Sequence, residues 1–138
     1  MKVMKNINFI EDAEKTIECN PGTVSEEKFN IMKEGGINRL SFGLQTTKNN
    51  LLRGIGRIHT FEAFKDNYNL ARSVGFNNIN IDMMFGLPNQ SVKDWTDSLE
   101  EVAKLNPEHI SAYSLIIEEG SPFYKLYNED KLKLPSEE

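Results

Sequence analysis

Residues 79–88 read INIDMMFGLP, an apolar run that ends at Phe85 and is closed by a glycine and a proline. β-Branched and large apolar residues bounded by turn formers are typical of a buried strand. Ser91 can cap the helix that follows, and Asn106-Pro107 ends that helix. A strand followed by an amphipathic helix is part of a βαβ unit, so this stretch predicts an α/β fold.

The same alternation of strand and helix recurs on both sides of residues 79–88. Further strands are expected at 16–19, 39–44 and 109–117, and further helices at 25–35, 50–54, 60–75 and 123–126. Repetition at roughly 30-residue spacing favours parallel strands joined by helical crossovers. About four strands could form a small open sheet or an arc of a (β/α) barrel.

Composition narrows the kinds of partner and chemistry. The 138 residues carry 16 Lys and Arg against 21 Asp and Glu, a net charge of −5, which argues against nucleic acid as the main partner. One cysteine cannot form an internal disulfide or the usual four-cysteine cluster site. No apolar run approaches the ~20 residues needed to span a bilayer, and no secretory signal is visible. A cytoplasmic protein is therefore the expectation.

Polar residues occur near the carboxyl ends of the expected strands. They are Glu18, Gln45 and Asp82, with Arg57 in the loop-rich stretch after the second strand. Parallel strands bring their carboxyl ends to one rim, so these groups are expected to converge. Each residue taken singly is more often structural than functional, and the shared rim is what favours a binding site.

Each of these residues has a functional and a structural interpretation. Asp82 either accepts hydrogen bonds from ligand hydroxyls or pairs with a neighbouring backbone or basic group, because an unpaired buried carboxylate is costly. Glu18 suits a cationic ligand group, a ribose hydroxyl or Arg39. Gln45 either recognises donor and acceptor groups of a ligand or caps the next helix. Arg57 follows two glycines and suits a ligand carboxylate.

Two other residues are given structural interpretations. His59 is expected to be a surface histidine leading into a helix, and it has no partner spaced for a zinc site. Cys19 has no nearby base or cationic pocket and is expected to be a small buried core thiol.

Five motifs occur in a characteristic order. They are IECNPGT (17–23), NRLSFGLQ (38–45), a segment from Leu51-Leu52 to GRIHT (51–60), NIDMMFGLPNQ (80–90) and HISAYSL (109–115). Together they resemble the radical S-adenosylmethionine (radical SAM) family of oxygen-independent coproporphyrinogen III oxidases and its heme-chaperone branch, usually called HemW. Residues 18–23, 56–60 and 114–123 are more similar to the HemW-like branch.

The resemblance implies a partial (β/α)₆ barrel. Residues 15–127 would form its central part, with strands three to six, between an irregular or truncated lead-in (1–14) and a charged tail (128–138). It implies that Glu18 contacts S-adenosylmethionine and that Gln45 and Arg57 hold a nucleoside or methionine part. It further implies that Asp82 binds ribose hydroxyls and that Ile116 lies where the adenine pocket is lined.

The sequence also departs from this family. The CxxxCxxC loop that binds the [4Fe–4S] cluster and a glycine-rich segment are not found in it, so the chain resembles a central fragment, and no catalytic residue or metal ligand is assigned. The intact protein would use S-adenosylmethionine and the cluster, and act on coproporphyrinogen III or bind heme. The fragment alone is expected to bind S-adenosylmethionine weakly or not at all, and to self-associate or to have limited stability. A complete small nucleoside-binding domain without redox chemistry is the alternative.

Overall fold

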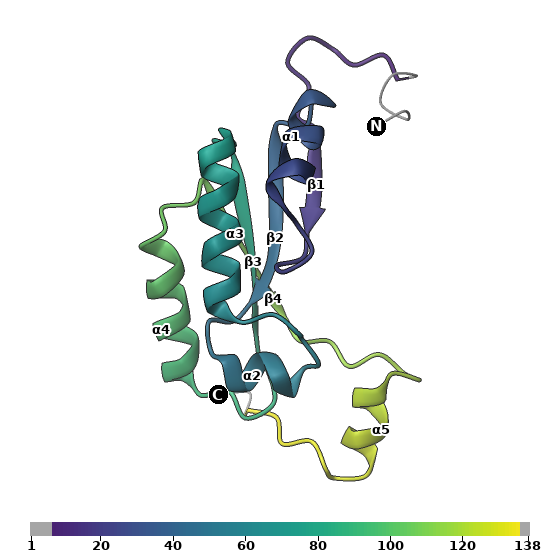
Figure 1. The fold of residues 1–138 in the computed structure, drawn as a ribbon. Coiled ribbons are helices and arrows are strands. Elements are labelled where there is room, and N and C mark those ends of the chain that lie inside the picture. The colour runs from purple at the N-terminus through teal and green to yellow at the C-terminus, as the bar shows by residue number, and fades with distance from the viewer. Residues whose placement is uncertain (1–6, 136–138) are drawn as a thin grey trace.

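The computed structural model describes residues 7–135 and contains a four-stranded sheet whose neighbouring strands are all parallel (Figure 1). The strands are β1 (Thr16–Cys19), β2 (Arg39–Gln45), β3 (Ile79–Phe85) and β4 (His109–Ser114), in the spatial order β1-β2-β3-β4. The helices are α1 (Glu26–Glu34), α2 (Asn49–Gly54), α3 (Phe61–Val74), α4 (Val92–Ala103) and α5 (Pro122–Asn128). The predicted α/β fold with parallel strands is confirmed.

Three of the helices cover one face of the sheet. Alternate residues of the strands point to this face, and they are apolar: Cys19, Leu40, Phe42, Leu44, Ile79, Ile81 and Met83. They pack against Phe29 of α1, Phe64 of α3 and Val102 of α4, each fully buried. Edge-to-face aromatic contacts join Phe42 to Phe29 and to Phe64, so the core is continuous from α1 to α3.

Local signals fix where the helices begin and end. Ser91 and Asp94 form a reciprocal capping box at the start of α4, and Thr60 caps α3 by accepting from the backbone N–H of Ala63. Gly75 ends α3 with a φ of 98°, a left-handed conformation that glycine adopts without steric cost. Ser91 is the cap that the sequence predicted, and Thr60 and Gly75 are the end residues of the helix predicted at 60–75.

The opposite face of the sheet is polar. It carries the other set of alternate residues, including Thr16, Glu18, Arg39, Ser41, Asn80, Asp82, His109, Ser111 and Tyr113. The strand arrows point toward the end of the sheet near which α2 and α5 lie (Figure 1). The carboxyl end of this polar face is therefore where a ligand is expected.

Two elements end more than one residue away from the sequence-based expectation. β4 ends at Ser114 rather than at 117, and α5 covers Pro122–Asn128 rather than 123–126. The apolar residues after Ser114 extend the hydrophobic pattern but not the sheet, and Ile116 is 75 % exposed. The division of the chain into a lead-in (1–14), a central part (15–127) and a charged tail (128–138) remains a prediction. Residues 1–6 of the lead-in and 136–138 of the tail lie outside the described part.

Within residues 7–135, none of the helices has the length and apolar character needed to cross a membrane.

Candidate functional site

A hydrogen-bond network centred on Asn80 occupies the middle of the polar face. The Asn80 side-chain nitrogen donates to Ser41 Oγ (2.9 Å) and to Asp82 Oδ1 (2.7 Å), and the Ser41 hydroxyl donates to Asp82 Oδ2 (2.8 Å). Asn80 Oδ1 accepts from Ser111 Oγ (3.0 Å) and lies 2.5 Å from His109 Nδ1. The network therefore joins β2, β3 and β4 and holds the Asp82 carboxylate in one orientation.

Asp82 is half-buried, and each of its oxygens accepts one hydrogen bond. The expected desolvation problem is solved by two polar side chains, Ser41 and Asn80, rather than by a backbone or basic group. An ionised carboxylate offers about four lone-pair sites, so the two bonds leave acceptor capacity on both oxygens. This arrangement suits a pair of neighbouring ligand hydroxyls. Asp82 can therefore join β2 and β3 through its bonds to Ser41 and Asn80 and still accept hydrogen bonds from a ligand.

Gln45 stands at an irregularity of the sheet. The register between β2 and β3 shifts between Gly43, which pairs with Asp82, and Gln45, which pairs with Met83. Gln45 has a φ of 69°, which is uncommon for a residue other than glycine. Bulges of this kind redirect a side chain and are frequent beside active sites.

The Gln45 side chain is buried, and its Oε1 has no hydrogen-bond partner among the described residues. A Cβ on Gly43 would lie 3.0 Å from Gln45 Nε2 and 3.6 Å from Asn20 Oδ1, so the missing side chain leaves room for both groups. Lys48, not Gln45, occupies the N-cap position of α2, so Gln45 does not cap that helix. A buried acceptor without a partner is uncommon in folded proteins, which makes Gln45 Oε1 a candidate to accept a hydrogen bond from a bound ligand.

Arg57 and Glu18 flank this position. Arg57 Nη1 donates to Asn20 Oδ1 (3.3 Å), which draws the loop after α2 toward the end of β1. Glu18 is exposed on β1 and pairs in register with Ser41, the partner of Asp82. Its carboxylate is therefore presented on the same polar face.

The suggested pairing of Glu18 with Arg39 is not observed. Arg39 Nε lies 3.8 Å from Glu14 Oε1, and Arg39 Nη1 donates to Thr16 Oγ1 (3.3 Å). Both partners lie at or before the start of β1, because the Arg39 guanidinium points toward the amino end of the sheet. Glu18, which lies nearer the carboxyl end, is left facing outward.

The structure thus places Glu18, Gln45, Arg57 and Asp82 on or beside the polar face of neighbouring strands, linked by the contacts of Asn20, Ser41 and Gly43. Ile116 lies two residues beyond the end of β4, at the carboxyl end of the sheet, with an exposed side chain. Its placement beside the other four residues remains a prediction.

His59 was interpreted wrongly from the sequence, because it is buried rather than on the surface. Its Nε2 lies 3.4 Å from the carbonyl oxygen of Leu44, the residue before Gln45. Burial holds the pKa of His59 below its usual value; the nearby Arg57 charge adds to this lowering, while the hydrogen bond to Leu44 opposes it. The neighbouring Ile58 is 93 % exposed, so no hydrophobic signal could have indicated which of the two faces inward.

Cys19 is buried on the helix-covered face, as expected, and burial raises the pKa of its thiol to about 11. Among residues 7–135, no group of three or more His, Cys, Asp or Glu side chains is arranged to hold a metal ion. The thiol faces the core and not the polar face, so it packs in the hydrophobic core and is not placed to bind a ligand on the polar face.

We expect Cys19 to resist alkylation in the folded protein. At about pH 8, a pKa near 11 leaves roughly one thiol in a thousand as the reactive thiolate, and burial blocks access as well. Iodoacetamide labelling followed by mass spectrometry should be at least ~100-fold slower in buffer than in urea. Equal rates in the two solvents would contradict the buried placement.

The same shift predicts a pH dependence of stability. Because the folded-state pKa of the thiol lies above its ordinary value of 9.0, the contribution of the protonated thiol is complete below that value. It is lost as the pH rises through about 11. Thermal unfolding followed across this range should therefore show a Tm that falls as the pH rises.

Comparison with known proteins gives a consistent assignment. A family model described as the radical SAM superfamily matches residues 1–102. The heme chaperone HemW of Bacillus subtilis (strain 168) is 44 % identical over 126 residues, covering 91 % of this chain and 33 % of that protein. The oxygen-independent coproporphyrinogen III oxidase of Helicobacter pylori (strain J99) is 36 % identical over 107 residues, covering 78 % and 23 %.

A solved structure extends the comparison to three dimensions. The coproporphyrinogen III oxidase HemN from Escherichia coli, described as a radical SAM enzyme, superposes with a TM-score of 0.80 at 31 % identity. The superposition covers 99 % of this chain and 32 % of that one. The chain spans about a third of the length of heme chaperone relatives that it matches.

Proposed function

This chain belongs to the radical SAM superfamily, and from that premise we propose that it is the S-adenosylmethionine-binding section of a longer protein of heme and porphyrin metabolism. The resemblance inferred from the five motifs is confirmed at the level of the superfamily and of its HemW-like and HemN-like relatives. The superfamily implies S-adenosylmethionine and a [4Fe–4S] cluster as cofactors.

The observation that carries the proposal is the combination of unused acceptors at one end of the polar face. Asp82 has lone pairs left on both oxygens, and the buried Gln45 Oε1 has no partner among the described residues. S-Adenosylmethionine is rich in matching donors, since it carries ribose hydroxyls, an adenine amine and an ammonium group. The donor and acceptor pattern therefore fits the cofactor.

Each proposed residue then has a chemical task. The Asp82 carboxylate accepts from ribose hydroxyls, and the exposed Glu18 carboxylate accepts from a cationic or hydroxyl group. Gln45 Oε1 accepts a further hydrogen bond, and Arg57, held by Asn20, offers its guanidinium to an anionic group of the ligand. Ile116 contributes apolar surface for a ring.

The cluster does not fit the same residues. The chain contains one cysteine, and it is buried under the helices on the other face of the sheet. We therefore assign the cluster ligands to other parts of the longer protein.

Because other parts of the longer protein are assigned the cluster ligands, we have two expectations for the 138-residue chain on its own. It should bind S-adenosylmethionine weakly, because the remaining contacts lie elsewhere. It should also tend to self-associate, because the polar face and the strand edges at β1 and β4 are open to pairing.

Two activities are compatible with the relatives. One is oxidation of coproporphyrinogen III, in which a propionate side chain loses a hydrogen atom, carbon dioxide and one electron, the last to an external acceptor, and becomes a vinyl group. The other is heme binding and transfer without oxidation, and it is favoured by the identity of 44 % to a heme chaperone against 36 % to an oxidase. A non-redox nucleoside-binding domain is the remaining alternative.

The experiment uses the full-length protein that contains this chain, with its cluster reconstituted under anaerobic conditions. We expect it to bind S-adenosylmethionine in calorimetry and to bind heme, detected as a Soret band, without forming vinyl product from coproporphyrinogen III. Vinyl product would replace the chaperone proposal by the oxidase. Absence of S-adenosylmethionine binding would remove both and leave the nucleoside-binding alternative.

A further inference from the structure

The backbone of Gln45 needs support from outside its own strand. A φ of 69° is unfavourable for a residue other than glycine and persists only where its surroundings over-determine it. The two residues that follow, Thr46 and Thr47, are buried, and so is Leu44 before it. The contacts of these neighbours therefore decide where the Gln45 side chain is held.

A buried hydroxyl cluster provides the contacts on one side. Ser98 of α4 is fully buried, and its Oγ lies 3.3 Å from Thr46 Oγ1 and 3.0 Å from Thr47 Oγ1. It also accepts from the Thr47 backbone N–H at 3.4 Å. One serine on a helix thus contacts both residues that continue the chain from Gln45.

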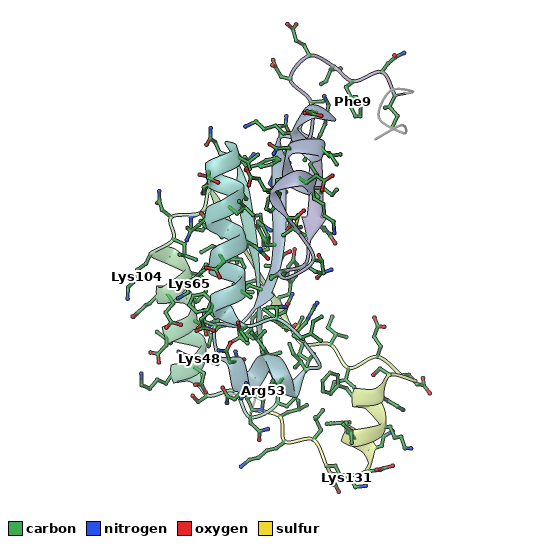
Figure 2. All side chains as sticks on the ribbon, viewed as in Figure 1. Phe9, Lys48, Arg53, Lys65, Lys104 and Lys131 are labelled. Atoms are coloured by element: carbon green, nitrogen blue, oxygen red, sulfur yellow. The ribbon has the colours of Figure 1, made fainter. Side chains whose placement is uncertain are left out.

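Charged groups close the cluster at its outer end. Thr47 Oγ1 donates to the Glu101 carboxylate, one helical turn beyond Ser98. Lys48 Nζ lies 3.6 Å from Glu101 and 3.7 Å from Asp97. Figure 2 labels Lys48 near α2, on the side toward α4. The segment after Gln45 is therefore fastened to α4 over three consecutive residues.

His59 provides the contact on the other side. A carbonyl oxygen can only accept, so His59 Nε2 carries the proton that it shares with the Leu44 carbonyl. His59 lies between Arg57 and the start of α3, so this bond ties the Arg57 loop to the strand that carries Gln45. The residues on both sides of Gln45 are therefore anchored, Leu44 by His59 and Thr46 by Ser98.

We propose that Ser98 is a positioning residue for Gln45, which sets the acceptor Gln45 Oε1 for S-adenosylmethionine through Thr46 and Thr47. This inference rests on the proposed function, because it names a residue that acts on the same binding site from the far side of β2. The competing interpretation is that the cluster only fastens α2 to α4. The two differ in what they predict for ligand affinity.

The test compares single and double variants of the full-length protein by S-adenosylmethionine calorimetry and thermal unfolding. Ser98→Ala removes the shared hydroxyl and is expected to weaken binding about 10-fold, the effect of one buried hydrogen bond. Thr96→Ala is the matched control on α4, since within residues 7–135 the Thr96 hydroxyl bonds only to the Val92 carbonyl of its own helix. It should leave the affinity within about 2-fold.

A double-mutant cycle asks whether Ser98 acts through Gln45. If it does, Gln45→Ala combined with Ser98→Ala binds no more weakly than Gln45→Ala alone. Additive losses overturn the proposal, as does a lowered Tm in Ser98→Ala with unchanged affinity. An unaffected affinity in Gln45→Ala overturns it as well, while leaving the Asp82 site standing.

A second pair of variants applies if Ser98→Ala does not fold. Thr47→Val keeps the shape and removes the hydroxyl, whereas Thr47→Ser keeps the hydroxyl. Weakened binding in Thr47→Val that is restored in Thr47→Ser supports the proposal, and equal affinities overturn it. If the wild-type protein does not bind S-adenosylmethionine at all, the proposed function fails first and this inference falls with it.

Discussion

Replacing Asp82 with alanine is expected to weaken S-adenosylmethionine binding by the full-length protein at least ~100-fold, since two hydrogen bonds to a charged group are each worth roughly 1.5–3 kcal/mol. The carboxylate is already oriented by Ser41 and Asn80, so little entropy is lost when a ligand binds to it. Alanine removes both acceptors and leaves the Asn80 amide with one partner fewer. Calorimetry with S-adenosylmethionine measures the effect.

Three variants separate binding from folding at this position. Asp82→Asn keeps the shape but places an amide nitrogen toward one of two existing donors, so a loss of about 10-fold is expected. Ser41→Ala removes one supporting bond without touching the carboxylate and should cost less. Asp66→Asn, on the exposed surface of α3, is the control. An Asp82→Ala protein that binds as tightly as the wild type would rule out this residue as a ligand-binding group.

Replacing Phe42 with alanine is expected to destabilise the fold by about 4 kcal/mol. Phe42 is fully buried at the centre of β2, with ring centroids 6.3 Å from Phe29 and 5.7 Å from Phe64. The variant loses the transfer free energy of the ring and leaves a cavity between α1 and α3. Because the total stability of a domain is typically about 5–15 kcal/mol, much of the protein should become insoluble on expression.

Urea denaturation of the full-length protein measures this loss, and Phe9→Ala is the matched control. Phe9, labelled in Figure 2, is 39 % exposed and contacts Lys15, whose Nζ lies 4.5 Å from the ring centroid. Its removal should cost less than about 1 kcal/mol. A Phe42→Ala protein with the unfolding midpoint of the wild type would show that this core is not what stabilises the sheet.

Much of the fold could be predicted because its signals are local. The runs at 39–45 and 79–85, the caps at Thr60 and Ser91, and the terminator Gly75 each lie within a few residues of the feature that they specify. The end of β4 was predicted wrongly, because residues 115–117 are as apolar as the strand before them. What distinguishes residues 115–117 from the strand is seen only in the structure, where Ile116 is exposed to solvent.

The types of residue at the site could also be predicted, but not their contacts. Alternation along parallel strands is enough to place Glu18, Gln45 and Asp82 near the carboxyl ends. Of the two partners of Asp82, Asn80 lies two residues away on the same strand, whereas Ser41 is brought there by the register between strands some forty residues apart in the chain, for which no local signal exists. Arg39 lies near Glu14 rather than the expected Glu18, and this choice of partner also depends on how segments distant in the chain are placed.

The sequence by itself determined the alternation of strands and helices, the apolar face of the sheet and the superfamily, because these depend on residue type and spacing alone. Only the tertiary structure decided that His59 is buried, that β2 carries a register shift before Gln45, and that Ser98 reaches Thr46 and Thr47. These features arise where elements distant in the chain meet. There, packing and the pairing of buried polar groups outweigh the preferences of any single residue.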